Sequence, residues 1–343
     1  MPVRGRTPLP WSAVHPLVRA VPVALLVATL LTGWIQAGDG AEAALRAPIR
    51  APLSTTTTTT GPVPTTTPAA STTTAPAPTT TVPPDVFALR PPAAAETPAA
   101  LAEQITAAER VIRDASTPQA AVAEAALAQQ VAYRQLGIHP EWDDAVLGAL
   151  PTDLRVAAQL NAAARREFRG MHSKLSGNLP AWRIVEPTPP DQLLALYQEA
   201  EAAFGIPWRY LAAINLVETG TGRIRGASSA GAQGPMQFMP ATWAAYGAGG
   251  DINDPRDAIM GAARYLAANN GAVDIDNALF RYNHSHRYVR GVKLYADLIA
   301  EHPRGFLGYY HWGVWYLTDQ GDEYLPVGYE ESAPVPIADY RAR

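Results

Sequence analysis

The sequence contains no cysteine, which excludes thiol nucleophiles, thiolate metal ligands and disulfide bridges together. Folding must therefore depend on the packing of an apolar core. The chain also lacks a strong charge of either sign, since its 343 residues carry a formal net charge of -4 at pH 7. No run of Lys or Arg with interleaved aromatic residues is present, so we expect no nucleic-acid partner.

Acidic residues are missing from the start of the chain as far as Asp39, and an apolar run over 20–35 follows three arginines. This is the charge order of an export signal. The run is shorter than the roughly 20 residues that a membrane-spanning helix needs, and residues 41–43 form a small-x-small cleavage site. We predict a cleaved signal peptide over 1–43, with an uncleaved membrane anchor as the alternative.

Charged residues are also absent from Ala51 to Pro84, where Thr, Pro and Ala dominate. Such a segment cannot bury enough apolar surface to offset the entropy lost on ordering, and proline extends it toward polyproline II. We expect a disordered linker over 44–96, either a tether for a head that works at a membrane or in a cell wall, or a passive spacer. The corresponding location is the cell wall, the periplasmic space or the exterior.

Alternation typical of strands is scarce after Pro98, and apolar residues instead recur at the three- and four-residue spacing of helices. We predict an accessory helical region over 97–183. It holds no group of polar residues that suggests a reaction, so a scaffold and a partner-binding region are both open. No protein partner can be predicted from the sequence.

A second helical block over 184–305 carries the candidate chemistry. Its first helix stops at Gly205. The next reads PWRYLAAINLVE from Pro207 and ends at Glu218, because Gly220 and Gly222 cannot sustain a helix. Later helices carry apolar stripes that include Tyr282, in one, and Tyr288 with Tyr295, in the next.

Glu218 lies at a helix C-terminus, where the dipole opposes negative charge by only about 0.3–1 kcal/mol. Burial in a closed cleft must therefore do most of the work of keeping this carboxyl protonated near neutral pH. The stretch SSAGAQGPMQFMPATW, from Ser228 to Trp243, can form such a cleft, with small residues for close approach and apolar cover behind them. Ser228 and Gln237 remain to hold substrate. A protonated carboxyl in such a cleft suits cleavage of a glycosidic bond.

A second catalytic carboxylate is hard to find. Hydrolytic glycosidases pair the acid with one about 5–9.5 Å away. Asp254 and Asp257 are expected to cap the helix that starts at Pro255, which leaves Asp251 in a Gly-rich loop. With one carboxylate, the acid must also serve as the base, and a hydroxyl of the sugar becomes the second reactant. The sequence therefore favours intramolecular transfer over hydrolysis.

Four motifs occur in an order and spacing that resemble those of lytic transglycosylases of the soluble-transglycosylase and goose-lysozyme-like group: VETG, SSAGAQGPMQFMPATW, DPRDAIMGAARYLA and ALFRYNHS. The resemblance spans 193–299, and the Thr/Pro-rich linker is similar to that of actinobacterial members. It implies an all-α, lysozyme-like fold that cuts peptidoglycan glycan strands between N-acetylmuramic acid and N-acetylglucosamine. Members leave a 1,6-anhydromuramoyl end, assisted by the substrate's own N-acetyl group, and the resemblance implies no cofactor.

The resemblance also assigns roles to residues of the cleft. Glu218 is the acid that protonates the glycosidic oxygen and then the base that takes the C6 hydroxyl proton. Ser228 polarises the N-acetyl group or the hydroxyl. Gln237 and Met239 match positions that contact substrate.

The last motif supplies two more expected site residues. Tyr282 is expected to place its hydroxyl near the glutamate, although its helical spacing also suits packing, and Asn283 is expected to fix a turn. Three features depart from the family pattern. Thr219 replaces the usual serine, one extra residue makes Ser229 a competitor for the serine role, and a His-Ser pair from His284 follows the asparagine.

Metal sites are not expected. His284 and His286 lack a third ligand at suitable spacing. Asp251, Asn253 and Asp254 form a weak calcium pattern without the loop glycine and the terminal glutamate.

An aromatic-rich extension over 306–343 ends the chain. Tyr310, Trp312 and Tyr316 lie at alternating positions before a turn over 319–322, which predicts a short hairpin. Exposed aromatics there would extend a sugar-binding groove, whereas buried ones would pack on the catalytic helices.

Two other functions stay open at this point. One is a lysozyme-type muramidase that hydrolyses the same bond with Asp251 as its second carboxylate. The other is a cell-wall-binding protein without catalytic activity.

Overall fold

The computed structural model describes residues 84–343. The predicted signal segment over 1–43 and residues 44–83 of the predicted linker lie outside the described residues. Within 84–343, none of the helices combines the length and apolar character needed to cross a membrane. The chain enters the described part through a short 3₁₀ helix, η1 (Pro84–Ala88), on which Val86 is buried.

The accessory region folds into helices, as its apolar spacing predicts. They are α2 (Pro98–Arg113), α3 (Gln119–Ile138), α4 (Asp143–Ala149) and α5 (Arg155–Arg169), with 3₁₀ turns η2 (Pro140–Trp142) and η3 (Thr152–Leu154). The Thr97 hydroxyl caps α2 by accepting the Ala100 N–H. The sequence did not reveal α4, a seven-residue helix whose one buried residue is Val146.

The second block is also helical. Its elements are α6 (Pro190–Phe204), α7 (Trp208–Thr219), α8 (Pro240–Tyr246), α9 (Pro255–Ala268), α10 (Ile275–Tyr282) and α11 (His286–Glu301), followed by α12 (Gly305–Tyr310). Gly205 ends α6 with a left-handed φ of 70°, as predicted. The all-α, lysozyme-like fold class is confirmed.

Short antiparallel strands join distant parts of the chain. The pairs are β1 (Asn178–Leu179) with β6 (Val335–Pro336), β2 (Arg183–Ile184) with β3 (Ile224–Arg225), and β4 (Val314–Tyr316) with β5 (Glu323–Leu325). A last helix, α13 (Ile337–Arg341), follows β6. The predicted hairpin is therefore present between β4 and β5. Its predicted start is wrong, because Tyr310 belongs to α12.

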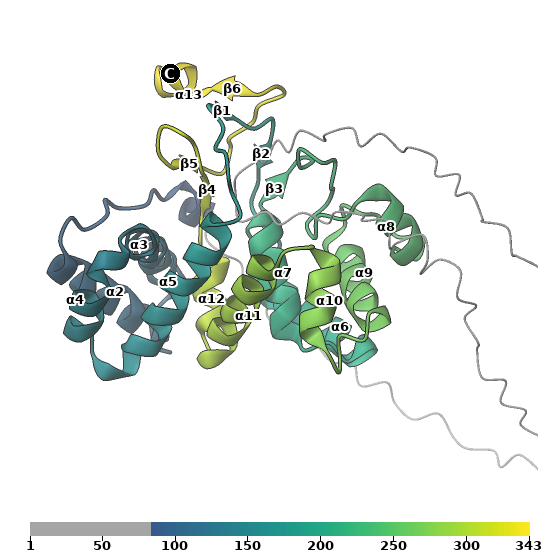
Figure 1. Cartoon of the computed structure of the whole chain (residues 1–343), viewed down its shortest axis with the longest axis horizontal. Coiled ribbons are helices and arrows are strands. Elements are labelled where there is room, and N and C mark those ends of the chain that lie inside the picture. Colours follow the sequence, from purple (N-terminus) through teal and green to yellow (C-terminus); the bar gives the residue numbers. More distant parts are fainter. Residues whose placement is uncertain (1–83) are drawn as a thin grey trace, which may run out of the picture.

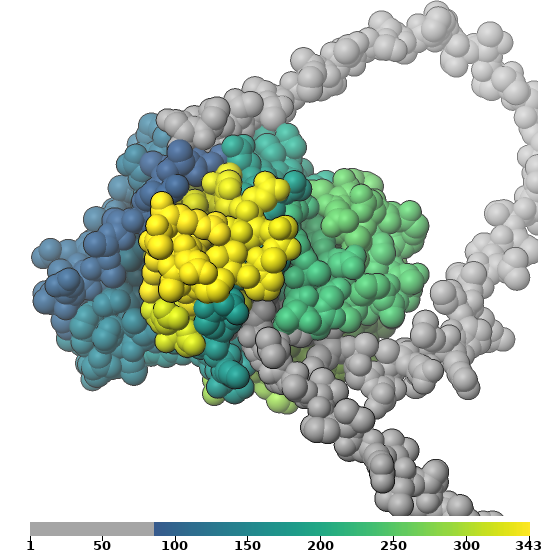
Figure 2. Space-filling view, turned by 90° about the horizontal axis from the view of Figure 1, so that it is seen from above, coloured from purple at the N-terminus to yellow at the C-terminus, as the bar shows by residue number. Residues whose placement is uncertain are grey.

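One hydrophobic core unites the accessory helices with the second block. The largest cluster of buried side chains runs from Leu101 on α2 to Trp312 after α12. Figure 1 shows α11 and α12 between α2–α5 on one side and α6–α10 on the other. Seen from above in Figure 2, the C-terminal extension covers the junction of the two halves. A smaller cluster that includes Trp182 and Tyr316 lies under the short strands.

A buried polar network stabilises the accessory side of this core. Glu109 is 3% exposed and accepts hydrogen bonds from Tyr133 Oη at 2.6 Å, Gln129 Nε2 at 2.9 Å and Arg113 Nε at 2.8 Å. Gln129 in turn accepts the indole N–H of Trp312 at 2.8 Å. The network therefore links α2 and α3 to the C-terminal extension.

Replacing Glu109 by Ala should destabilise the fold by about 2–5 kcal/mol, because it leaves the buried donors of Tyr133 and Gln129 unpaired, while Arg113 keeps its ion pair with Glu301. Glu109→Gln keeps an acceptor and should cost less. Asp153→Ala, which removes an ion pair with Arg110 that is more than half exposed, should leave stability nearly unchanged. Urea unfolding of the three variants measures the order, and equal losses for Glu109→Ala and Asp153→Ala would contradict it.

Candidate functional site

The helix that carries Glu218 ends one residue after it. Helix α7 ends at Thr219, whereas the sequence predicted an end at Glu218. Gly220 takes a left-handed φ of 59°, and its N–H donates to Leu216 O at 3.0 Å. This glycine cap turns the chain toward β3 and leaves Glu218 in the last helical turn.

The Glu218 carboxyl is fully buried. Its Oε1 accepts a hydrogen bond from the Tyr288 hydroxyl at 2.8 Å, while Oε2 has no hydrogen-bond partner among residues 84–343. Burial raises the pKa of Glu218 well above its usual value, and the Tyr288 hydrogen bond opposes that rise. This shift favours the acid form of Glu218, which is the direction that the sequence predicted.

The three aspartates at the start of α9 accept hydrogen bonds from backbone N–H groups. Asp254 caps α9 by accepting the Asp257 N–H at 2.9 Å, as predicted. Asp257 is not a second cap, because its Oδ2 accepts the Asp251 N–H at 2.9 Å. The Asp251 carboxylate is exposed and accepts the Asn253 N–H at 2.8 Å. Asp251 thus occupies a solvated turn, in contrast to the fully buried Glu218.

The stretch beside Glu218 forms a tight turn. Gly234 has φ of 73°, and a Cβ there would lie 1.9 Å from Ile252 O, so only glycine permits this approach. Gln237 is buried with φ of 50°, and both its N–H and its Nε2 donate to Gly234 O at 3.0 Å. In this structure Gln237, a predicted substrate contact, holds the turn.

Thr219 joins this turn to α7. Its hydroxyl donates to Pro235 O at 2.6 Å and accepts the Gly222 N–H at 3.1 Å. Asn215 Nδ2 also donates to Pro235 O, at 2.8 Å, and Tyr197 Oη donates to Asn215 Oδ1 at 2.6 Å. Sequence reasoning missed Asn215, although a polar residue within an apolar helix is a signal for such a role.

Ser228 holds the loop before the turn. It is half-buried, and its Oγ accepts the Ala232 N–H at 3.0 Å while its own N–H donates to Ala232 O at 2.9 Å. Its hydroxyl proton can still be donated to a ligand. Met239 is half-buried against the core and occupies the N-cap position of α8.

The tyrosine bonded to Glu218 is not the one that the motif suggested. Tyr282 is buried, and its hydroxyl donates to Met236 O at 2.6 Å. Burial raises the pKa of Tyr282, and the charge of Glu218 adds to that rise, so the two groups lie near each other. Tyr288, expected only as a core position, stacks on Tyr282 with ring centroids 6.4 Å apart and supplies the hydrogen bond.

Asn283 fixes the bend between α10 and α11. It is 3% exposed, and its carbonyl accepts the Ser285 N–H at 2.6 Å. Its Nδ2 has no hydrogen-bond partner in the described part of the chain. His284 and His286 contact the Phe280 ring, and residues 84–343 contain no group of three His, Cys, Asp or Glu that could hold a metal ion.

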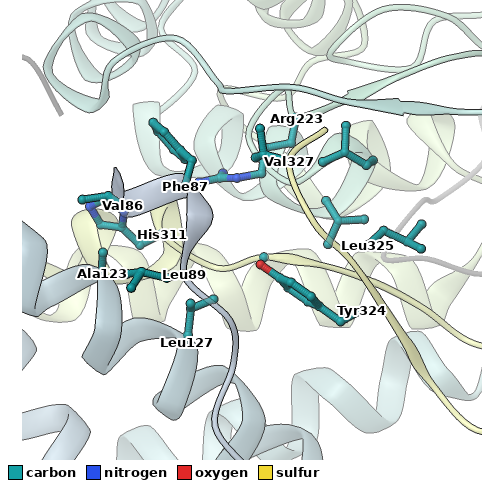
Figure 3. A pocket seen from close by; sticks show the side chains of 13 residues that line it. Val86, Phe87, Leu89, Ala123, Leu127, Arg223, His311, Tyr324, Leu325 and Val327 are labelled. Carbon is teal, nitrogen blue, oxygen red and sulfur yellow. The ribbon is translucent and has the colours of Figure 1, made fainter. Parts of the chain in front are cut away.

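A small pocket lies behind the turn that follows Glu218 (Figure 3). Arg223 reaches into it and donates to Gly220 O at 2.9 Å and Thr221 Oγ1 at 2.6 Å. Phe87 and His311 also line this pocket, which has a volume of about 20 Å³. That volume suits about one water molecule and is too small for a sugar ring. Arg223 therefore stabilises the turn.

The three alternating aromatic residues of the C-terminal extension are buried rather than exposed. Tyr310, Trp312 and Tyr316 are 0%, 1% and 3% exposed. Trp312 packs on Tyr295 of α11 with ring centroids 5.8 Å apart. Of the two roles left open by the sequence, packing on the helices is the one observed.

Comparison with known proteins identifies part of the chain. Residues 195–297 match the family model of the transglycosylase SLT domain. No curated protein and no solved structure matches the chain. The matched segment contains Glu218, the turn around Gln237 and the pair Tyr282–Asn283, and it excludes α2–α5 and the C-terminal extension. The predicted resemblance is confirmed here, and residues 195–297 form a transglycosylase SLT domain of the lysozyme-like type.

Proposed function

We propose that this protein is an exported lytic transglycosylase that cuts peptidoglycan between N-acetylmuramic acid and N-acetylglucosamine and leaves a 1,6-anhydromuramoyl end. The SLT domain implies a transglycosylase that acts on peptidoglycan in general. The finer proposal rests on one observation, the fully buried Glu218 with a single hydrogen bond to Oε1. Only the sequence supports the export of the protein and the disordered linker over 44–96, which are part of this proposal.

In the first step, Glu218 acts as a general acid. Because Tyr288 donates to Oε1, that oxygen serves as the carbonyl acceptor and the proton resides on Oε2. Oε2 has no competing partner among the described residues, but it is buried, so we propose that it donates to the glycosidic oxygen once glycan binding opens a path to it. The bond between C1 of the muramic acid and that oxygen then breaks, and the leaving sugar takes the proton.

In the second step, the same carboxyl acts as a base. The Glu218 carboxylate, stabilised by the Tyr288 hydroxyl, takes the proton of the C6 hydroxyl while O6 attacks C1. One C–O bond is broken and one is formed, no water is consumed, and Glu218 regains its proton. Ser228, whose hydroxyl proton is available, is proposed to hold the N-acetyl group that assists at C1.

The position of Asp251 favours this route over hydrolysis. An inverting or retaining hydrolase needs a second carboxylate that faces the same bond as the acid. Asp251 is exposed and spends one oxygen on the Asn253 N–H, whereas Glu218 is fully buried. The muramidase alternative therefore has less support than transfer to the C6 hydroxyl.

Glu218→Gln should reduce the release of anhydromuropeptides by about 10²–10⁴-fold, because the amide can neither donate nor take the proton. The fold should persist, since the amide has the shape of the neutral acid. Mass spectrometry of digested peptidoglycan, together with thermal unfolding, measures both. Reducing muramic ends among the wild-type products would instead support hydrolysis, and glycan binding without any release would support the non-catalytic alternative.

Activity should fall as the pH rises through the raised pKa of Glu218, since the first step needs the protonated form. Tyr288→Phe removes a hydrogen bond that favours the carboxylate, so the pKa of Glu218 should rise further. The alkaline limb of kcat/KM against pH should then move to higher pH, while the maximum rate falls. A limb that moves to lower pH would contradict this assignment of Tyr288.

A further inference from the structure

We infer that Phe168, on α5 and outside the SLT domain, is a positioning residue for the acid: its ring holds Tyr288 against Glu218 and keeps water away from the pair. This inference rests on the proposed role of Glu218 as the acid. It gives the accessory region a part in the reaction, where its sequence suggested either a scaffold or a partner-binding surface.

Helix α5 packs closely against α11, and the two form one of the two most extensive helix pairs in residues 84–343 (Figure 1). Gly291 makes this approach feasible. A Cβ on Gly291 would lie 2.5 Å from two atoms of the Phe168 ring. Glycine is unfavourable within a helix. The space that Gly291 leaves for the Phe168 ring explains why α11 carries a glycine at this position.

The Tyr288 ring is packed between two other aromatic rings. Phe168 is 4% exposed and meets Tyr288 edge-on, with centroids 6.4 Å apart and planes at 89°. On the SLT side, Tyr282 stacks on Tyr288 at 6.4 Å with planes at 7°. Tyr282 is itself tethered by its hydrogen bond to Met236 O. One aromatic ring from each region thus fixes the ring whose hydroxyl reaches Oε1 of Glu218.

The same packing keeps Tyr288 and Glu218 away from water. Tyr288 and Glu218 are both fully buried, and burial is the largest cause of the raised pKa of each. Phe168 stacks on Tyr295 at 5.7 Å and fills the space between α5 and α11 beside Tyr288. A smaller or displaced side chain would loosen the packing around the Tyr288 ring and admit water toward the pair, which favours the charged form of Glu218.

The titratable groups that surround Glu218 are few. From α11 comes Tyr288 and from α10 comes Tyr282, which acts at longer range. None of these groups lies on α5, so a change at Phe168 alters packing and solvation near Glu218 without removing a charge.

The test measures the Glu218 carboxyl directly in the full chain, by ¹³C NMR titration with the signal assigned through its loss in Glu218→Gln. Phe168→Leu should lower the titration midpoint by on the order of 0.5–1 pH unit and move the alkaline limb of activity by the same amount. Gly291→Ala, which displaces the Phe168 ring from the other helix, should shift both in the same direction.

Phe306→Leu is the matched control. Phe306 is also buried, at 6% exposure, but its aromatic contacts are Tyr197, Trp208 and Tyr310 rather than Tyr288. It should lower the melting temperature while leaving the Glu218 midpoint in place. An unchanged midpoint in Phe168→Leu and Gly291→Ala, with only a lower melting temperature, would overturn the inference. Lack of anhydro products from the wild type would instead refute the proposed function, because the NMR midpoints do not depend on activity.

Discussion

The chemistry proposed for this site depends on the removal of one carboxyl group from water. The dipole of α7 opposes ionisation of Glu218 by well under 1.4 kcal/mol, so it cannot keep the group protonated at neutral pH. Complete burial has the larger effect, and it is the first cause of the raised pKa of Glu218. Burial of an unpaired acid costs stability, which the rest of the core must offset. The site is therefore a constraint that the whole fold has to satisfy.

The walls around Glu218 meet this constraint with hydrogen bonds to backbone carbonyls. Pro235 O takes hydrogen bonds from Thr219 and Asn215, and Gly220 O takes one from Arg223. Backbone carbonyls thus bind the polar side chains on either side of the acid, and no ion pair in residues 84–343 includes Glu218. An ion pair with a cation would lower the pKa of Glu218 and oppose the effect of burial. Among residues 84–343, the contact that stabilises the charged form is the Tyr288 hydroxyl, and its effect on the pKa is smaller than that of burial.

Local features of this arrangement were predictable from the sequence, and distant ones were not. The stop of α7 near Glu218 follows from Gly220, and the end of α6 follows from Gly205, because both glycines act within a few residues. Tyr288 lies 70 residues from Glu218, so its hydroxyl contact depends on how α11 docks on α7, which no spacing rule gives. The chain over 310–316 alternates like a strand, yet Tyr310, Trp312 and Tyr316 are all buried, and short buried runs fit a helix as well as a strand. Tyr310 accordingly ends α12.

The matched SLT segment is smaller than the physical unit that makes Glu218 an acid. The core is continuous from α2 to Trp312, and Phe168 of α5 and Tyr282 of α10 hold the same tyrosine from two sides. In the proposed reaction, exclusion of water would act in two ways. It would favour the protonated carboxyl, and it would keep away the nucleophile that competes with the sugar's own C6 hydroxyl. The proposed mechanism therefore needs no second carboxylate to activate water, because the desolvation that raises the pKa of the acid would also favour intramolecular transfer over hydrolysis.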